Sequence, residues 1–237
     1  MSTTTATKVD SRQRLLAAAW ELLWLNSYAT VSVDDLCKRA EVNKGSFYHH
    51  FESKVALAEA AFAEQWACLR PLLDGIFSVQ VAPLERLDGY AAMTLRFQGE
   101  KSQEFGQVLG CPWVTLGSEA GARDSELRAV AALKADRVTC YFAAAIREAQ
   151  ALGQVPAGDA QELAEMCQAF VTGTAARARI SNSLEPFKRM AAGIRRLLGA
   201  AALPESAANV PVAGMPACTA AGVPAAGVPV ATTPHAN

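Results

Sequence analysis

The chain has 237 residues, of which 51% are hydrophobic and 19% charged, and its formal net charge is −1 at pH 7. This size fits one core or a small head beside a larger body, and the near-neutral charge gives no global field that attracts nucleic acid or membranes. A local basic patch can still bind DNA. No run of about 18 apolar residues or apolar signal segment is visible, so we expect a cytoplasmic protein without membrane partners.

The cysteines do not follow the spacing of a metal site or of a disulfide framework. None of them forms a C-x-x-C pair, and no histidine stands at zinc-finger spacing from them. We therefore expect no metal and no cofactor, and mostly buried, reduced thiols. The six cysteines are Cys37, Cys68, Cys111, Cys140, Cys167 and Cys218.

The first part of the chain predicts a flexible arm over residues 1–10 and a helical head over 11–57. Apolar residues recur at helical spacing over 11–25. Further helices are predicted after the capping residues Ser32, Asn43 and Ser53, the last ending near Arg70-Pro71. Two short helices joined by about three residues have the geometry of a helix-turn-helix motif that reads DNA.

Residues 58–200 are predicted to form a larger helical body. Three apolar stripes at helical spacing contain Val138, Leu163 and Phe187, and Asp159 and Pro186 are start signals for the last two helices. Alternating β-branched runs are absent, so the predicted fold class is all-α. Residues 201–237 contain six prolines and one charged residue, which predicts a disordered Ala/Pro-rich tail.

The segment 42–54, "VNKGSFYHHFESK", resembles the recognition region of the TetR/AcrR-type bacterial transcriptional regulators. That resemblance implies an all-helical homodimer with a helix-turn-helix head and a body that binds an inducer and dimerises. It also implies a palindromic double-stranded DNA operator and a nucleoid-associated location in the bacterial cytoplasm. The chain departs from the family where Asn26-Ser27-Tyr28 replaces a common glycine, and where Leu36-Cys37 replaces an Ile-Ala pair.

Several residues of the head are expected to contact DNA. A cap at Asn43 puts 44–46 in the first turn of the recognition helix, near base edges and phosphates. Side chains after this turn and at the starts of the neighbouring helices can bind phosphate oxygens. The predicted set is Ser32, Lys44, Gly45, Ser46, Tyr48, His49 and Lys54.

The remaining aromatic residues of this segment are assigned to packing. Phe47 and Phe51 are spaced four apart and are expected in the core of the head. His50 is expected to pack or cap. The adjacent histidines diverge on a helix, so they do not form a metal or acid–base site.

Two segments of the body, 110–128 and 176–194, resemble the electrophile-responsive branch of that family, that of the N-ethylmaleimide reductase repressor. The resemblance implies that Cys111 can be a sensing thiol. A lysine of that branch corresponds to Arg179, which does not readily form the nitrogen–sulfur products open to lysine. Independently, Pro112 favours a helix start, which puts Cys111 near an N-cap that stabilises a thiolate.

Other residues could complete the sensing site. Arg177 or Arg179 could lower the pKa of Cys111, and Trp113 and Tyr141 could line an inducer pocket. The alternatives are that Cys111 is only a small residue at a helix crossing, and that the aromatic residues are simple core.

The leading hypothesis is a sequence-specific DNA-binding repressor, not an enzyme. A small-molecule inducer, or modification of Cys111 by an electrophile or oxidant, would release it from its operator. A thiol-dependent enzyme remains an alternative, but the histidines lie in the head and at His235, so the usual Cys–His pair is missing. A helical protein-binding scaffold is a third possibility, which leaves the 45–54 pattern unexplained.

Overall fold

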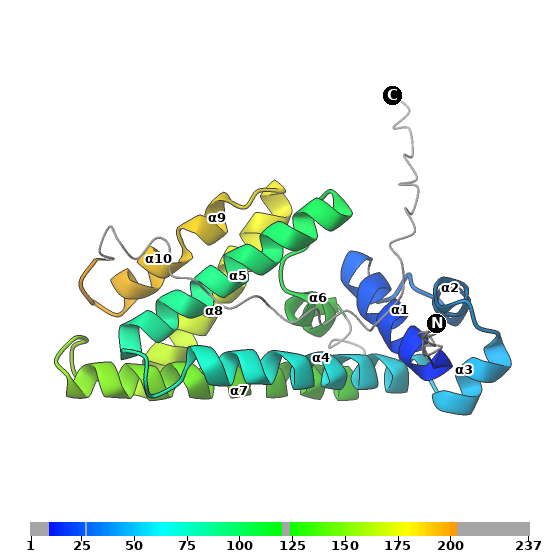
Figure 1. Cartoon of the computed structure of the whole chain (residues 1–237), viewed down its shortest axis with the longest axis horizontal. Helices are drawn as coiled ribbons and strands as arrows, with labels where there is room; N and C mark the ends of the chain where they lie inside the picture. The colour runs from blue at the N-terminus through cyan, green and yellow to red at the C-terminus, as the bar shows by residue number, and fades with distance from the viewer. Residues whose placement is uncertain (1–9, 27, 120–123, 203–237) are drawn as a thin grey trace, which may run out of the picture.

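The computed structural model describes residues 10–26, 28–119 and 124–202. Its ordered elements in these ranges are ten α-helices without a strand, which confirms the all-α prediction. Three short or medium helices form a head at one end of the elongated molecule, and the others form the body (Figure 1). The predicted arm over 1–9 and almost all of the Ala/Pro-rich tail lie outside the described residues.

The head consists of α1 (Ser11–Leu25), α2 (Val33–Ala40) and α3 (Lys44–His50), with the predicted caps. Ser32 Oγ accepts from the Asp35 amide at 3.1 Å, and Asp35 Oδ2 accepts from the Ser32 amide at 2.9 Å, which forms a reciprocal capping box. Glu41 takes the left-handed conformation with φ of 53°, and so turns the chain from α2 into α3. Local sequence thus sets the helix-turn-helix geometry.

Helix α4 (Lys54–Ile76) continues through Pro71, so the predicted end near Arg70-Pro71 is wrong. Proline removes one backbone hydrogen bond from a helix interior and usually bends or ends the helix. Here the next turn carries Leu73, which is fully buried in the hydrophobic core of the body. That burial holds the last turns helical, and α4 reaches from the head into the body (Figure 1).

In the body, α7 packs against α8, α5, α6 and α4. Asp159 caps α8 as predicted, because its Oδ1 accepts from the Gln161 amide at 2.8 Å. The helix predicted to start at Pro186 is divided in two at Arg189. The body helices are α5 (Pro83–Phe105), α6 (Pro112–Glu119), α7 (Ser125–Ala151), α8 (Ala160–Ser181), α9 (Glu185–Lys188) and α10 (Met190–Leu197).

Two hydrophobic clusters organise the described residues. One lies within the body, and the other joins the buried residues of α1–α3 to Phe62 of α4 and to Trp113, Leu116 and Leu127 of α6 and α7. The boundary predicted after residue 57 falls inside α4 and inside this second cluster. The head therefore packs directly on the body instead of hanging from a linker.

A buried ion pair fastens α10 to α5. Arg195 Nε donates to both carboxylate oxygens of Asp88, at 3.0 and 3.1 Å, and the two side chains are only 9% and 5% exposed. Arg195 Nη1 also donates to the Ala201 carbonyl at 3.2 Å. Removing one member of such a pair leaves the other charge buried without compensation.

We expect Asp88→Asn to lower the free energy of unfolding by about 3 kcal/mol, because the guanidinium stays buried without a counter-charge. Urea denaturation followed by circular dichroism measures the change. The double variant Asp88→Leu with Arg195→Met removes both charges and should recover most of the loss. A single-variant loss below about 1 kcal/mol would show that the pair is not effectively buried.

Candidate DNA-binding helices and effector cavity

Helix α3 presents one polar face to solvent. Phe47 is fully buried, whereas Tyr48 is 58% exposed and Lys44 and His49 are also exposed. Lys44 Nζ lies 2.8 Å from Asp34 Oδ1 of α2, in an ion pair whose side chains are 61% and 67% exposed. Such an exposed pair contributes little stability, so Lys44 can exchange its partner for a phosphate.

The start of α3 is shaped by its cap. Asn43 Oδ1 accepts from the Ser46 amide at 2.7 Å. A Cβ added at Gly45 would lie 3.2 Å from that same oxygen, closer than most side-chain contacts. Glycine therefore protects the cap and also leaves the helix start open to close approach. Ser32, at the start of α2, is exposed beside this turn.

Lys54, which was predicted to contact phosphate, already has partners within the head. Its Nζ donates to the carbonyls of Tyr28 and Val31, at 2.8 and 2.9 Å, and lies 4.0 Å from the centroid of the Tyr28 ring. Burial lowers the pKa of Lys54. Two of its three N–H groups are thus used to hold the loop between α1 and α2.

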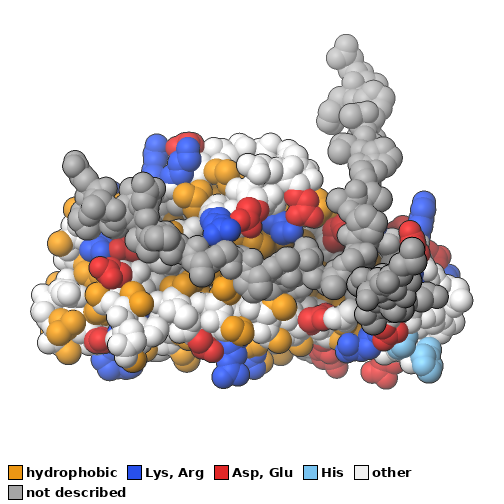
Figure 2. Space-filling model, in the orientation of Figure 1, with side chains coloured by type: hydrophobic (Ala, Val, Ile, Leu, Met, Phe, Trp, Pro, Cys, Tyr) orange, Lys and Arg blue, Asp and Glu red, His pale blue; other side chains and the backbone are white. Residues whose placement is uncertain are grey.

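His50 ties the end of α3 to the start of α1. Its Nε2 shares a 2.7 Å hydrogen bond with Ser11 Oγ, which agrees with a packing role. His49 is exposed, with its ring 4.9 Å from that of His50. The histidine side chains gather at the tip of the head, among side chains of both charges (Figure 2). The head therefore has no single basic patch in this view.

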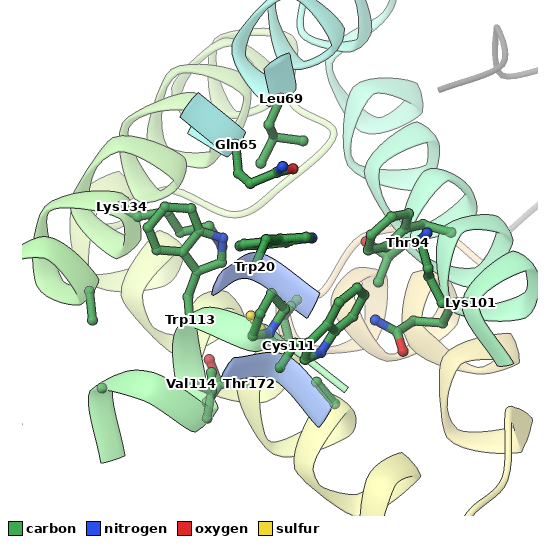
Figure 3. Close-up of a pocket in the computed structure, with 18 of the residues that line it drawn as sticks. Trp20, Gln65, Leu69, Thr94, Lys101, Cys111, Trp113, Val114, Lys134 and Thr172 are labelled. Atoms are coloured by element: carbon green, nitrogen blue, oxygen red, sulfur yellow. The ribbon is translucent and has the colours of Figure 1, made fainter. Parts of the chain in front are cut away.

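A cavity of about 530 Å³ lies between the head and the body. Its walls come from α1, α4, α5, α6, α7, α8 and α9, and Trp20 and Trp113 lie side by side in its wall, with ring centroids 6.4 Å apart (Figure 3). Trp113, which was predicted to line an inducer pocket, is one of the residues that border this cavity. The aromatic lining consists of Trp20, Trp24, Tyr90, Phe97, Phe105, Trp113 and Phe187.

Tyr141 does not line this cavity, which corrects the prediction. Its hydroxyl donates to Asp74, and its ring lies 5.2 Å from that of Phe77. Burial and the carboxylate of Asp74 raise the pKa of Tyr141 to about 12. Tyr141 thus links α7 to α4 instead of facing a ligand.

Cys111 borders the cavity and stands at the predicted N-terminus of α6. Its carbonyl accepts from the Thr115 amide at 3.2 Å, the first hydrogen bond of the helix. The preceding Gly110 has φ of +69°, and its carbonyl accepts from Trp24 Nε1 at 3.2 Å and from Gln98 Nε2 at 2.8 Å. The peptide beside the thiol is therefore bonded directly to α1.

The two arginines that were predicted to act on the thiol have different surroundings. Arg179 Nη1 donates to the Leu109 carbonyl at 3.1 Å and to Thr115 Oγ1 at 2.8 Å, so it braces the loop before α6. Arg177 is exposed on α8 and does not line the cavity. The cation that borders the cavity near Cys111 is Lys134 of α7.

Lys134 was not among the site residues predicted from the sequence. Burial opposes its charged form, but interactions with Cys111 and Tyr90 outweigh this effect and raise the pKa of Lys134. Lys134 is one lysine in an alanine-rich helix, so no local pattern marks it. Trp20 and Trp24 were missed too, although two tryptophans four residues apart are more than a small head needs to fill its core.

Metal binding and membrane insertion are two other functions on which the described residues bear. In the described ranges, no group of three or more His, Cys, Asp or Glu residues is placed to hold a metal ion. No helix in the same ranges is long and apolar enough to cross a membrane.

Comparison with known proteins identifies the family. Residues 15–61 match the bacterial regulatory proteins of the tetR family, and residues 83–194 match a tetracyclin repressor-like C-terminal domain. The chain is 33% identical to the transcriptional regulator AcuR of Cereibacter sphaeroides over 178 residues, which cover 74% of this chain and 80% of AcuR. It is 27% identical to the HTH-type transcriptional repressor NemR of Escherichia coli over 201 residues, covering 83% and 98% of the two chains.

The fold agrees with this assignment. The crystal structure of E. coli NemR in its reduced form superposes with a TM-score of 0.68 over 81% of this chain and all of that chain. These relatives are transcriptional regulators, so the comparisons give no support to the thiol-dependent enzyme. The chain therefore belongs to the TetR family of bacterial regulatory proteins and is a DNA-binding transcriptional regulator.

Proposed function

We propose that this regulator is a repressor and that a ligand in its effector cavity controls its affinity for a palindromic operator. The observation that carries the proposal is the double role of α1, which forms a cavity wall and also supports the DNA-reading helices. Trp20 and Trp24 face the cavity. On the same helix, Glu21 Oε1 accepts from Arg39 Nε of α2 at 3.0 Å, and Ser11 bonds His50 of α3.

In this mechanism, filling the cavity displaces α1 and with it α2 and α3. A closely packed interior does not absorb added volume locally, so a ligand that pushes Trp20 away from Trp113, now 6.4 Å apart between ring centroids, favours a different head position. The ligand shifts the equilibrium by its difference in affinity between the two positions. The repressor NemR gives the analogy for the direction of regulation.

Modification of Cys111 is proposed as a second route to the same displacement. An adduct on the thiol adds volume at the cavity edge and strains the Gly110 peptide, whose carbonyl is bonded to Trp24. NemR was crystallised in a reduced form, and that relative is the analogy for a redox-sensitive residue here. Arg179 then acts by bracing the loop, since its hydrogen bonds flank Cys111 on both sides.

For DNA contact, we propose that the exposed face of α3 enters the major groove. Lys44, Ser46, Tyr48 and His49 reach base edges and phosphates, and Gly45 permits close approach. Ser32, at the start of α2, and the remaining N–H of Lys54 are proposed phosphate donors at the flanks.

The proposed homodimer pairs α8 with its copy. Met166, Gly173 and Ile180 are seven residues apart and so share one face of α8. Met166 and Ile180 are 48% and 78% exposed, and no atom lies within 4 Å of a Cβ added at Gly173. An exposed apolar face with room for close approach suits a self-complementary contact.

The proposed contact of Lys44 with DNA can be tested by mutation. We expect Lys44→Ala to weaken operator binding about tenfold and to lower the slope of log affinity against log salt by about one, because one phosphate contact is lost. Fluorescence anisotropy with the DNA upstream of the gene measures both. Lys188→Ala, which removes a lysine from a similar exposed pair with Glu185 on α9, should change neither. Equal behaviour of the two variants would contradict the placement of α3.

The second prediction concerns the dimer. Ile180→Glu places a charge within the proposed contact and should give monomers in sedimentation velocity. Val79→Glu is the matched control, because Val79 is equally exposed at 78% but lies between α4 and α5. A dimer that survives Ile180→Glu would place the contact elsewhere.

The third prediction concerns the thiol. Treatment with iodoacetamide should release wild-type protein from the operator, whereas Cys111→Ser should stay bound. Cys140→Ser serves as the control because Cys140 is exposed but lies away from the cavity, and it should be released like the wild type. Release of Cys111→Ser to the same extent would remove Cys111 as the sensor.

A further inference from the structure

In the described residues, every charged side chain that lines the cavity forms an ion pair, except one. Within the described residues, each carboxylate of the lining has a cationic partner, at 2.5 to 2.9 Å. One of these partners is Lys101, the second lysine of the lining. The pairs are Glu21 with Arg39, Glu100 with Arg96, and Glu104 with Lys101.

Lys134 is the exception. In the part of the chain that the structure describes, it forms no ion pair or hydrogen bond, and its Nζ lies 6.0 Å from the centroid of the Trp113 ring. Its side chain is half-buried in the wall of the cavity. Burial disfavours its charged form, whereas Cys111 and Tyr90 favour it and raise the pKa of Lys134, so the side chain is a cation without a carboxylate partner.

A second polar group is also left without a partner. Gln168 Nε2 is buried and has no hydrogen-bond acceptor, and Gln168 of α8 lines the same cavity. Burial raises the pKa of the neighbouring Tyr90, so its neutral hydroxyl does not supply the missing negative charge. The cavity therefore contains an unpaired cation and an unpaired amide donor, on the packed helices α7 and α8.

We propose that the effector is an aromatic monocarboxylate whose anionic group binds Lys134. This inference rests on the proposed function, since it names the ligand class of the same cavity. Gln168 is the accompanying donor. One cation balances a monoanion, whereas a phosphate dianion would retain an uncompensated charge. The tryptophans supply flat apolar walls, and about 530 Å³ holds a body of one or two rings.

The two lysines of the lining offer a matched pair of variants. Lys134 lies beside Trp113, whereas Lys101 lies on the opposite side of the cavity near Thr94 (Figure 3). Lys101 already has Glu104 as its partner, at 2.6 Å. Lys134→Met removes the unpaired charge, and Lys101→Met removes a paired one of the same type.

The experiment titrates the full chain with benzoate, cinnamate and 2-naphthoate, and with the neutral amide of each, following tryptophan fluorescence. At least one acid should bind about tenfold or more tightly than its amide. Lys134→Met should abolish this preference and Lys101→Met should keep it. Lys134→Gln repeats the test if the methionine variant does not fold.

Three results would overturn the proposal: equal binding of acids and amides, undiminished acid binding by a folded Lys134 variant, or no acid binding up to about 10 mM. Operator binding by ligand-free protein is measured separately. A chain that binds operator but no acid loses only the carboxylate site. A chain that binds acids through Lys134 but never binds operator refutes the repressor and leaves the site intact.

Discussion

The packing of α1 on both of its sides is the constraint on which the rest of the structure depends. One side places Leu15 and Leu23 in the cluster that holds the recognition helices, and Phe47 of α3 is buried in that cluster. The other side presents Trp20 and Trp24 to the cavity. A helix confined in this way does not move independently of either neighbour, so the position of the head and the content of the cavity are linked through rigid packing.

Two ion pairs of the head differ in how far their side chains are exposed to solvent. Arg39 and Glu21 join α2 to α1 with side chains that are 14% and 19% exposed, so solvent and salt weaken this pair little. The pair of Lys44 with Asp34 is mostly exposed and easily exchanged. The first therefore makes α2 follow α1 when that helix shifts, whereas the second leaves a cation available at the DNA surface. The ion pair that holds two helices together is thus largely shielded from solvent, whereas the lysine proposed to contact DNA is exposed to it.

Local sequence predicted the head well because caps are local. Ser32 and Asn43 bond amides three residues away, so the starts of α2 and α3 follow from short segments. Pro71 was misjudged because the distant core that buries Leu73 keeps α4 helical. The residues of the site were harder to predict, because their partners too are distant in the sequence. Lys54 has two loop carbonyls as partners, contributed by residues 28 and 31, and no spacing rule brings Lys134 beside a thiol 23 residues earlier in the chain.

Non-covalent and covalent signals converge on the same helix in the proposed mechanism. A ligand between the cavity walls contacts Trp20, and an adduct on Cys111 disturbs the Gly110 carbonyl that Trp24 donates to. Both act on α1, so both change the same equilibrium between head positions. Coupling between two binding sites is reciprocal. Operator DNA must then lower the affinity of the cavity for its effector by the same factor by which the effector lowers affinity for DNA. Protein off the operator therefore binds effector first, and release persists until the free effector concentration falls.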